Sequence, residues 1–334
     1  MSVRFALNGV GSIGRALIRI AATRADLELV AINDLGSVDQ IARLLARDTL
    51  HGKFPGDVSV EAGMLVIDGR RIAVQQQAEA AMIDWSDSEI RVVVDATGKC
   101  SSREQAKIHL KESVEKVLVS ANAAGLDLTI CIGVNHRAYE AARHHLLSAA
   151  SCTTNCLAPI AHVLHNRFGL KRGLLNTVHS YNNDQHLLDF PHHDPRRARA
   201  ATLNMIPTTT SAIEALGRVI PELKGRFAGF AVRVPTPNVS LIDLTLEFDR
   251  PVTVDALNNS LRQAAAEDLK GILAVTEEEL VSSDFMGSTF SATVDLPLTQ
   301  SVDDRLFRIV AWYDNEWGHA SRLADLLELV GRAG

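Results

Sequence analysis

The sequence predicts an α/β chain: a doubly wound parallel sheet followed by an α+β domain whose sheet is mostly antiparallel. Two observations predict this division. Up to about residue 151, short apolar runs alternate with helical stretches, which is typical of a parallel sheet covered on both faces. After Cys152 the apolar runs are longer and follow one another more directly, as in an antiparallel sheet. A chain of 334 residues is long enough for both domains.

The expected elements follow from these runs. In the first half we expect a helix and several short strands, at residues 15–24 for the helix and 3–7, 27–32, 91–95, 116–120 and 129–133 for the strands. In the second half we expect a helix and longer strands, at residues 153–167, 230–234 and 239–248. The domains are then residues 1–151 and 152–318, and an amphipathic helix within 319–334 packs back on the first domain.

One long segment, residues 184–205, has little periodicity. It is polar and basic and carries Pro191, Pro195 and the cluster Arg196-Arg197-Ala198-Arg199. Ordered loops of this length are usually functional or covered by a partner. The arginines at 196 and 199 are expected either to bind anions or to form salt bridges at a subunit interface.

Composition excludes several classes of protein. The hydrophobic content of 46% and the charged content of 22% are ordinary for a globular protein, and a net charge of -6 gives no sign of a nucleic-acid surface. No run approaches the roughly 18 apolar residues of a membrane helix, and the N-terminus lacks the apolar stretch of a signal peptide. The four cysteines form no metal-type pair, so we expect free thiols, no metal and a cytoplasmic location.

A glycine-rich loop follows the first strand and opens the first helix, in the order Asn8-Gly9-Val10-Gly11-Ser12-Ile13-Gly14. The glycines allow backbone N–H groups to approach a pyrophosphate at a helix N-terminus. Asp34 lies 20 residues after Gly14, where a carboxylate accepts from ribose hydroxyls and repels a 2′-phosphate. The alternative is a plain glycine turn. We predict a Rossmann domain that binds NAD through loop and strand-end residues, namely Gly9, Gly11, Ser12, Ile13, Gly14, Asn33, Asp34, Thr97, Gly98 and Ser120.

The segment Ser151-Cys152-Thr153-Thr154-Asn155-Cys156 places a cysteine among hydroxyl and amide groups, and His179 lies on the next apolar stretch. A thiolate attacks carbonyls well, but a free thiol is mostly protonated at neutral pH and needs a neighbouring base or cation. The alternative for Cys152 is a buried structural cysteine. We predict a thiol–imidazole site at Cys152 and His179, and ordinary packing roles for Cys100, Cys131 and Cys156.

Six segments in fixed order carry a family resemblance: residues 8–15, 151–159, 177–185, 196–207, 233–239 and 312–318. Together they closely resemble the phosphorylating, NAD-dependent glyceraldehyde-3-phosphate dehydrogenase family and its near relative, erythrose-4-phosphate dehydrogenase. The resemblance implies that Cys152 forms a thioester with an aldehyde, that His179 activates the thiol through an ion pair and then serves as base, and that Asn315 holds the nicotinamide carboxamide. It also implies a homotetramer.

Two anions need binding in such an enzyme, the phosphate of the aldehyde substrate and inorganic phosphate. By resemblance, Arg233, Arg197 and Asn182 serve the first, and Ser151, Thr153, Thr210 and Ser211 the second. A guanidinium suits bidentate phosphate recognition, and hydroxyl groups add donors. Asn182 stands where threonine is usual, and Ser211 where glycine is usual. Both departures concern phosphate recognition and leave the thiol chemistry intact.

Three functions follow as hypotheses. The first is phosphorylating oxidation of glyceraldehyde 3-phosphate to the acyl phosphate 1,3-bisphosphoglycerate, in glycolysis or gluconeogenesis. The second is oxidation of erythrose 4-phosphate with hydrolysis of the thioester; Asn182 and Ser211 motivate it, whereas Pro237 and Phe190-Pro191-His192 favour the glycolytic branch. The third is an NAD-binding regulator without catalysis, against which the retained cysteine and histidine speak.

Overall fold

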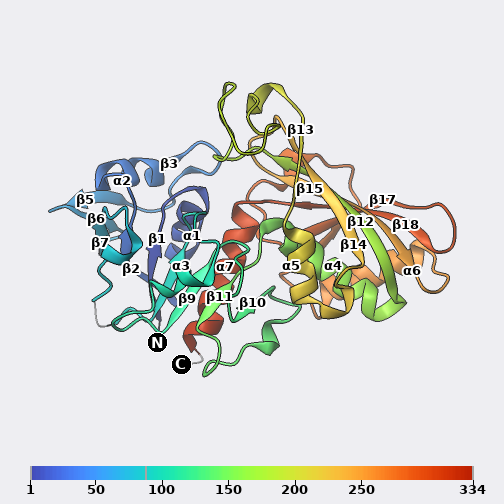
Figure 1. Ribbon diagram of the computed structural model, residues 1–334, viewed down its shortest axis with the longest axis horizontal. Coiled ribbons are helices and arrows are strands. Elements are labelled where there is room, and N and C mark those ends of the chain that lie inside the picture. The colour runs from blue at the N-terminus through green and yellow to red at the C-terminus, as the bar shows by residue number, and fades with distance from the viewer. Residues whose placement is uncertain (1, 87–88, 333–334) are drawn as a thin grey trace. The chain divides into compact units, whose positions relative to one another are not determined.

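We describe a computed structural model, which covers residues 2–86 and 89–332 (Figure 1). The described chain divides into two compact units. The first unit contains the described residues within 1–130, 137–150 and 320–334, and the second contains residues 131–136 and 151–319.

The first unit is built on a parallel-rich sheet. Among the described residues, nine strands pair in the order β10-β11-β9-β8-β1-β2-β7-β6-β5. Their bounds are β1 Val3–Asn8, β2 Leu27–Asn33, β5 Val58–Glu61, β6 Met64–Ile67, β7 Arg70–Gln75, β8 Val92–Asp95, β9 Lys116–Val119, β10 Leu128–Thr129 and β11 Leu146–Ser148. Pairing is parallel except at β5–β6 and β6–β7. The chain moves from β1 to β2 on one side and later to β8 on the other, so the sheet has its switch point at β1.

The helices of this unit begin and end with local signals. They are α1 Ser12–Ala22, α2 Val38–Ala46 and the short α3 Arg103–Lys107, and a two-stranded ladder joins β3 Arg47–Asp48 to β4 Gly52–Lys53. Ser37 and Ser102 cap α2 and α3, each in a reciprocal capping box with a glutamine three residues on. The C-terminal helix α7, Trp317–Arg332, joins this unit from Ala320 onward. Arg24 fixes it by an ion pair to Asp325 at 2.8 Å.

The second unit contains the mostly antiparallel sheet. Seven strands of the described chain pair in the order β13-β14-β12-β15-β18-β17-β16. They are β12 Leu170–Ser180, β13 Ile206–Thr208, β14 Phe227–Val234, β15 Ser240–Phe248, β16 Leu273–Thr276, β17 Ala292–Ser301 and β18 Leu306–Tyr313. Only the β12–β14 and β16–β17 pairs are parallel. The helices are α4 Cys152–Phe168, α5 Ala212–Val219 and α6 Val254–Ala266, and α4 packs on the sheet with most of its surface buried.

The predicted fold class is confirmed in both parts, and one predicted strand is wrong. Of the expected strand 129–133 only Thr129 pairs in the sheet, as the last residue of β10 Leu128–Thr129. The chain then turns: the amide of Cys131 donates to the Asn135 side chain, and Gly133 has a φ of 86°. Residues 130 and 131 are apolar and fully buried, which produced the strand-like pattern. A buried apolar run does not by itself require strand pairing. In the nine-stranded sheet of the described chain, β5, β6, β7 and β11 were not predicted.

The long segment 184–205 is irregular up to Ala201, as predicted, and it projects from the second unit beside β13 (Figure 1). Its own contacts order it. Asp189 pairs with Arg199 at 3.0 Å, and the amide of Phe190 donates to the carbonyl of Ala198. Large apolar side chains in and beside it are more than half exposed, namely Leu187, Leu188, Phe190, Leu203 and Met205.

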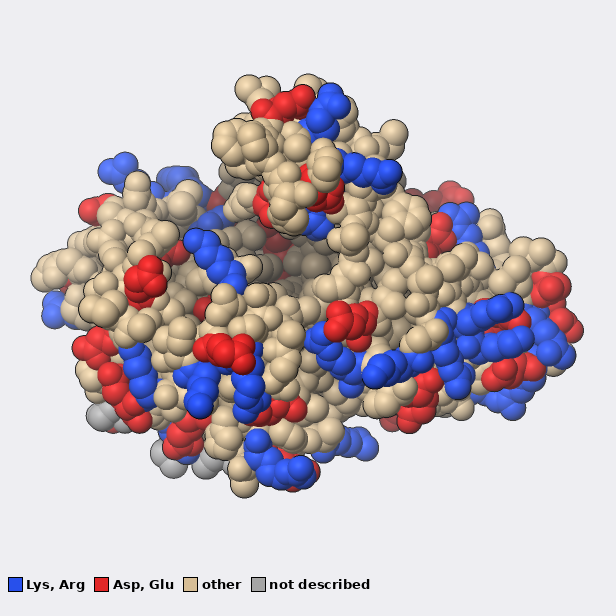
Figure 2. All heavy atoms as spheres, in the orientation of Figure 1, with Lys and Arg blue, Asp and Glu red and all other residues tan. Residues whose placement is uncertain are grey.

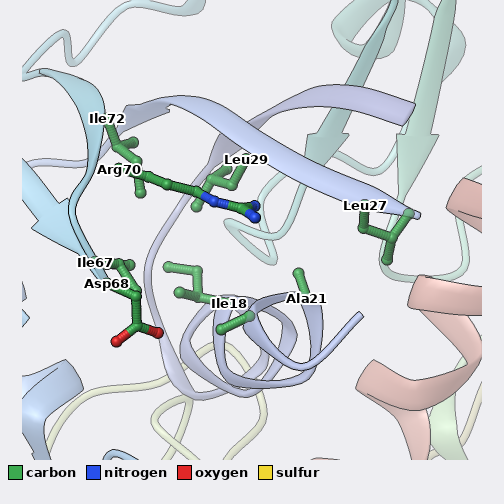
Figure 3. Close-up of a pocket in the computed structure, with 9 residues that line it drawn as sticks. Ile18, Ala21, Leu27, Leu29, Ile67, Asp68, Arg70 and Ile72 are labelled. Atoms are coloured by element: carbon green, nitrogen blue, oxygen red, sulfur yellow. The ribbon is translucent and has the colours of Figure 1, made fainter. Parts of the chain in front are cut away.

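A small open cavity of about 140 Å³ lies in the first unit between α1 and the sheet (Figure 3). Ile18, Leu27 and Ile72 contribute to its apolar lining, and Arg70 and Asp68 also line it. None of the predicted site residues lies in it. On the face of the molecule in Figure 2, Lys and Arg are interspersed with Asp and Glu, in keeping with the mild net charge.

Candidate active site

The three loop glycines are required for different reasons. Gly9 has a φ of 95°, and a Cβ there would lie 2.8 Å from the amide nitrogen of Thr97. A Cβ on Gly14 would lie 2.2 Å from the carbonyl oxygen of Gly9, so this glycine lets α1 pack against the loop. A Cβ on Gly11 would meet no atom within 4 Å. Gly11 therefore leaves open space at the first turn of α1, where no side chain caps the helix.

A cavity of about 500 Å³ lies at the carboxyl ends of strands β1, β2 and β8. Five predicted cofactor residues line it: Gly9, Gly11, Asn33, Asp34 and Thr97. The other predicted residues of this unit do not line it, namely Ser12, Ile13, Gly14, Gly98 and Ser120. Its remaining lining mixes apolar side chains with polar groups, as a nucleotide site requires. The open space at Gly11 and the uncapped helix end fit a pyrophosphate.

Asp34 also holds the loop itself. Its carboxylate accepts from the amide of Val10 at 2.7 Å and from that of Gly36 at 2.8 Å. These bonds keep the carboxylate beside the cavity, where it disfavours a 2′-phosphate.

A buried polar ladder beneath the loop was missed by the sequence analysis. Asn33, Asn8 and Asp95 pair in register across β2, β1 and β8. Asn33 donates to Asn8 at 2.9 Å, and Asn8 donates to Asp95 at 2.9 Å. Burial raises the pKa of Asp95, but hydrogen bonds, beginning with that of His109, outweigh burial and leave this pKa below its usual value. The sequence signal that could have indicated this ladder is that each of the three apolar strands ends in a polar residue.

Cys152 is the first residue of α4. Ser151 caps this helix by accepting from the amide of Thr154 at 3.1 Å, so the thiol lies at a helix N-terminus. The end of β12 brings His179 to it, with the imidazole Nε2 3.6 Å from Sγ. This separation lies within the range for a hydrogen bond to sulfur, and the helix end favours a thiolate.

The other imidazole nitrogen has two neighbours. Nδ1 of His179 lies 2.7 Å from the Ser180 carbonyl and 2.6 Å from Nη1 of Arg233. The carbonyl favours a proton on Nδ1, which leaves the Nε2 lone pair facing the thiol. Arg233 favours the opposite tautomer, with an Nε2–H facing sulfur.

The electrostatic surroundings of this pair bear on the ion pair that the resemblance implies. Burial raises the pKa of Cys152, and Arg233 opposes this rise. Burial, followed by Arg233, lowers the pKa of His179 to about 3. Both directions favour a neutral thiol beside a neutral imidazole. Arg233 is thus the charged group that promotes thiolate formation, while His179 has the position of a base.

Tyr313 was not predicted as a site residue. Its hydroxyl lies 2.9 Å from Oγ1 of Thr153 and 2.9 Å from Oγ1 of Thr177, and its ring meets that of His179 edge-on. It therefore links α4, β12 and β18 behind the thiol. No motif reveals this role, because the three residues lie far apart in sequence.

The predicted phosphate-binding residues fall into separate groups. Arg233 touches His179, whereas the hydroxyls of Ser151 and Thr153 already bond Thr154 and Tyr313. Asn182 and Arg197 are linked through Asp184, which donates its amide to Asn182 at 3.2 Å and accepts from Arg197 at 2.7 Å. Arg197 also donates to Thr208, another residue that the sequence analysis missed.

The other two of these residues lie beside α5. Thr210 accepts from the amide of Ala212, and Ser211 is the residue before the helix. Thr210 and Arg197 line one groove of about 910 Å³.

Asn315 lies directly after β18 and its neighbour Tyr313. Its side-chain oxygen accepts from the hydroxyls of Ser180 and Ser240. Neither serine was predicted as part of the site.

Residues 2–86 and 89–332 contain neither a candidate metal cluster nor a candidate membrane helix. No group of three or more His, Cys, Asp or Glu side chains there could hold a metal ion. No helix in these ranges is long and apolar enough to span a membrane.

The first unit thus has a dinucleotide-binding loop and cavity, and the second has a thiol, an imidazole and arginines. Family models match both parts. Residues 3–103 match the NAD binding domain of glyceraldehyde 3-phosphate dehydrogenase, and residues 151–315 match its C-terminal domain. The chain belongs to the glyceraldehyde-3-phosphate dehydrogenase family.

Similar proteins extend over the whole chain. The chain is 47% identical over 334 residues to a glyceraldehyde-3-phosphate dehydrogenase of Geobacillus stearothermophilus, covering 100% of both chains. It is 48% identical over 331 residues to glyceraldehyde-3-phosphate dehydrogenase 1 of Bacillus cereus and 46% identical over 333 residues to the Streptomyces coelicolor enzyme, covering 99% of each chain in both cases.

Proposed function

We propose that this chain is an NAD-dependent, phosphorylating glyceraldehyde-3-phosphate dehydrogenase that acts in glycolysis or gluconeogenesis. The observation that carries the proposal is the placement of the Cys152 thiol at a helix N-terminus, 3.6 Å from Nε2 of His179. The whole-length similarity to enzymes of that name supports the substrate. It does not favour the erythrose-4-phosphate alternative.

The proposed reaction begins at sulfur. The Cys152 thiol gives its proton to Nε2 of His179, the thiolate adds to the aldehyde carbon, and the proton passes from His179 to the resulting alkoxide, which gives a hemithioacetal. His179 takes the hydroxyl proton through Nε2 as the C–H bond breaks, and a thioester remains. NAD, when bound, accepts the hydride; the loop at Gly9 and Gly11 and the carboxylate of Asp34 would hold it. Inorganic phosphate then attacks the thioester carbonyl and restores the thiolate.

The substrate phosphate and inorganic phosphate are assigned to different groups of residues. We assign the substrate phosphate to Arg233, Arg197 and Asn182. Inorganic phosphate is assigned to hydroxyl residues, namely Ser151, Thr153, Thr210 and Ser211. The ion pair between Arg197 and Asp184 supports the first assignment, because it fixes the direction of the guanidinium. The assignment predicts that Arg197→Ala raises KM for the aldehyde more than KM for inorganic phosphate.

The function is tested by following NADH formation from glyceraldehyde 3-phosphate and NAD, with and without inorganic phosphate. A parallel series uses erythrose 4-phosphate. We expect turnover of the triose that depends on phosphate. Faster turnover of the tetrose, indifferent to phosphate, would instead assign the erythrose-4-phosphate reaction, and no turnover of either would favour a non-catalytic NAD-binding protein.

We also propose a homotetramer in the cytoplasm. The exposed apolar side chains in and around 184–205 support self-association, because solitary chains rarely expose such a group together. The need for a free thiol at Cys152 supports a reducing compartment. Analytical ultracentrifugation tests the assembly: we expect a species of four 36.2 kDa chains. A monomer at micromolar concentration would contradict it.

A further inference from the structure

Two buried serines hold the side chain of Asn315. Its Oδ1 accepts from Oγ of Ser180 at 2.9 Å and from Oγ of Ser240 at 3.0 Å. Ser180 is fully buried and Ser240 is 2% exposed. Both hydroxyls therefore use the Asn315 oxygen in place of water, which buried polar groups require.

This arrangement fixes which end of the amide is presented. The oxygen and the NH₂ group of an asparagine have similar shapes but opposite hydrogen-bonding character. Ser240 Oγ also accepts from the amide of Ser180 at 3.1 Å, so its own proton points to Asn315. If the Asn315 amide flipped, the two serine protons would lose their acceptor. The serines thus keep Oδ1 inward and leave the NH₂ group as the end available to a ligand.

The backbone that carries Asn315 is fixed as well. Asp314 is 1% exposed, and its Oδ1 accepts from the amides of Glu316 and Trp317 at 2.9 and 2.8 Å. Its Oδ2 accepts from Asn238 at 3.1 Å and from the amide of Gly287 at 2.8 Å. Four hydrogen bonds to one buried carboxylate hold the turn, so the Asn315 side chain has little freedom except rotation of its amide.

The end of β12 carries both Ser180, which holds Asn315, and His179, the proposed base. Ser180 directly follows His179 on β12, and Ser240 is the first residue of the adjacent β15. The side chain of His179 is directed to the Cys152 thiol, and that of Ser180 to Asn315. The arrangement therefore couples the base and the amide through one rigid strand end.

We propose that Ser180 and Ser240 are positioning residues that orient Asn315 so that its NH₂ group donates to the carbonyl oxygen of the nicotinamide carboxamide. This inference rests on the proposed function, in which Asn315 contacts the nicotinamide. By fixing the direction of that donor, the two hydroxyls determine which face of the ring receives the hydride. Neither serine touches the substrate or exchanges a proton with it.

The test compares Ser180→Ala, Ser240→Ala and the double variant with the wild type. The substrate is glyceraldehyde 3-phosphate deuterated at the aldehyde carbon, and NMR of the reduced cofactor shows on which side of C4 the deuterium lies. The wild type should give one diastereomer. The double variant should give a measurable fraction of the other and a KM for NAD raised about tenfold, and each single variant should show a smaller effect.

Two controls separate positioning from general damage. Ser260→Ala removes another buried hydroxyl of the second unit, whose oxygen has no hydrogen-bond partner in the structure, and should leave both readouts unchanged. The rate of Cys152 alkylation by iodoacetamide should stay within about twofold in the serine variants, because His179 keeps its place. A single diastereomer and an unchanged KM for NAD in the double variant would overturn the proposal.

Failure of the proposed function would be recognised separately. If the wild type does not oxidise the triose but binds NAD by calorimetry, the function is wrong and the positioning role is read from affinity alone. NAD should then bind the double variant about tenfold more weakly than it binds Ser260→Ala. Equal affinities would overturn the inference.

Discussion

The first unit presents its predicted cofactor loop mainly through backbone, whereas the second presents its reactive groups through side chains from distant strands. Gly9, Gly11 and Gly14 act by what they lack: a Cβ on Gly14 would meet Gly9 of the same loop, one on Gly9 would meet the backbone of Thr97, and Gly11 leaves open space. Cys152 and His179, in contrast, are 27 residues apart and meet only because α4 packs on β12. Binding in the first unit should therefore be sensitive to backbone conformation, and chemistry in the second to single functional groups.

The largest expected effect is the loss of aldehyde oxidation, with NAD binding retained, when the Cys152 thiol is removed. Cys152→Ser should lower aldehyde oxidation at least about 10⁴-fold, because a hydroxyl at this pH is a far weaker nucleophile than a thiolate. NAD affinity, measured by calorimetry, should stay within about twofold. Cys156→Ala, one helical turn on, is the matched control and should keep most of the activity. Retained turnover in Cys152→Ser would exclude the thioester mechanism.

The second prediction contrasts two glycines. Gly9→Ala should destabilise the chain by about 1–3 kcal/mol, since it places a Cβ at positive φ against the backbone of Thr97. Gly11→Ala has no such conflict and should unfold at the wild-type temperature. Its Cβ should nevertheless weaken NAD binding by occupying space at the helix end. Thermal unfolding with and without NAD distinguishes them, and equal losses of stability would contradict the assignment.

The third prediction concerns Arg233, which lowers the pKa of both Cys152 and His179. In Arg233→Gln the thiol pKa should rise, so that alkylation of Cys152 at pH 7 slows by about threefold to tenfold and its pH profile moves to higher pH. Arg308→Gln removes an exposed arginine that pairs with Asp243; it is the control and should not change the profile. An unmoved profile in Arg233→Gln would show that Arg233 does not act on the thiol.

The smallest expected effect lies beneath the cofactor loop. The pKa of Asp95 is lowered in the folded chain, so its contribution to stability is present above its unfolded pKa of about 3.9 and is lost as pH falls through the folded value. Asp95→Asn should cost about 1–2 kcal/mol at pH 7 and less at pH 3. Urea unfolding at the two pH values measures this. A loss that is equal at both would mean that the charge of Asp95 contributes nothing.

The two sites also differ in how well they can be predicted from the sequence, because one depends on a local pattern and the other on contacts between distant strands. A glycine loop between a strand and a helix is a local pattern, and α1 and α4 begin within three residues of their predicted starts. The antiparallel strands β5, β6 and β7 were missed because each has only four to six residues, and neither Met64–Ile67 of β6 nor Arg70–Gln75 of β7 alternates regularly between buried and exposed positions. Tyr313, Ser180 and Ser240 could not be assigned from sequence, because their roles arise from hydrogen bonds between separate strands.

The most direct test of the central claim is the mass of the Cys152 peptide after mixing enzyme, NAD and glyceraldehyde 3-phosphate without inorganic phosphate and quenching within milliseconds. The account predicts a burst of one NADH per chain and an acyl adduct on Cys152 that disappears when phosphate is added. A full burst of NADH with an unmodified Cys152 would contradict it.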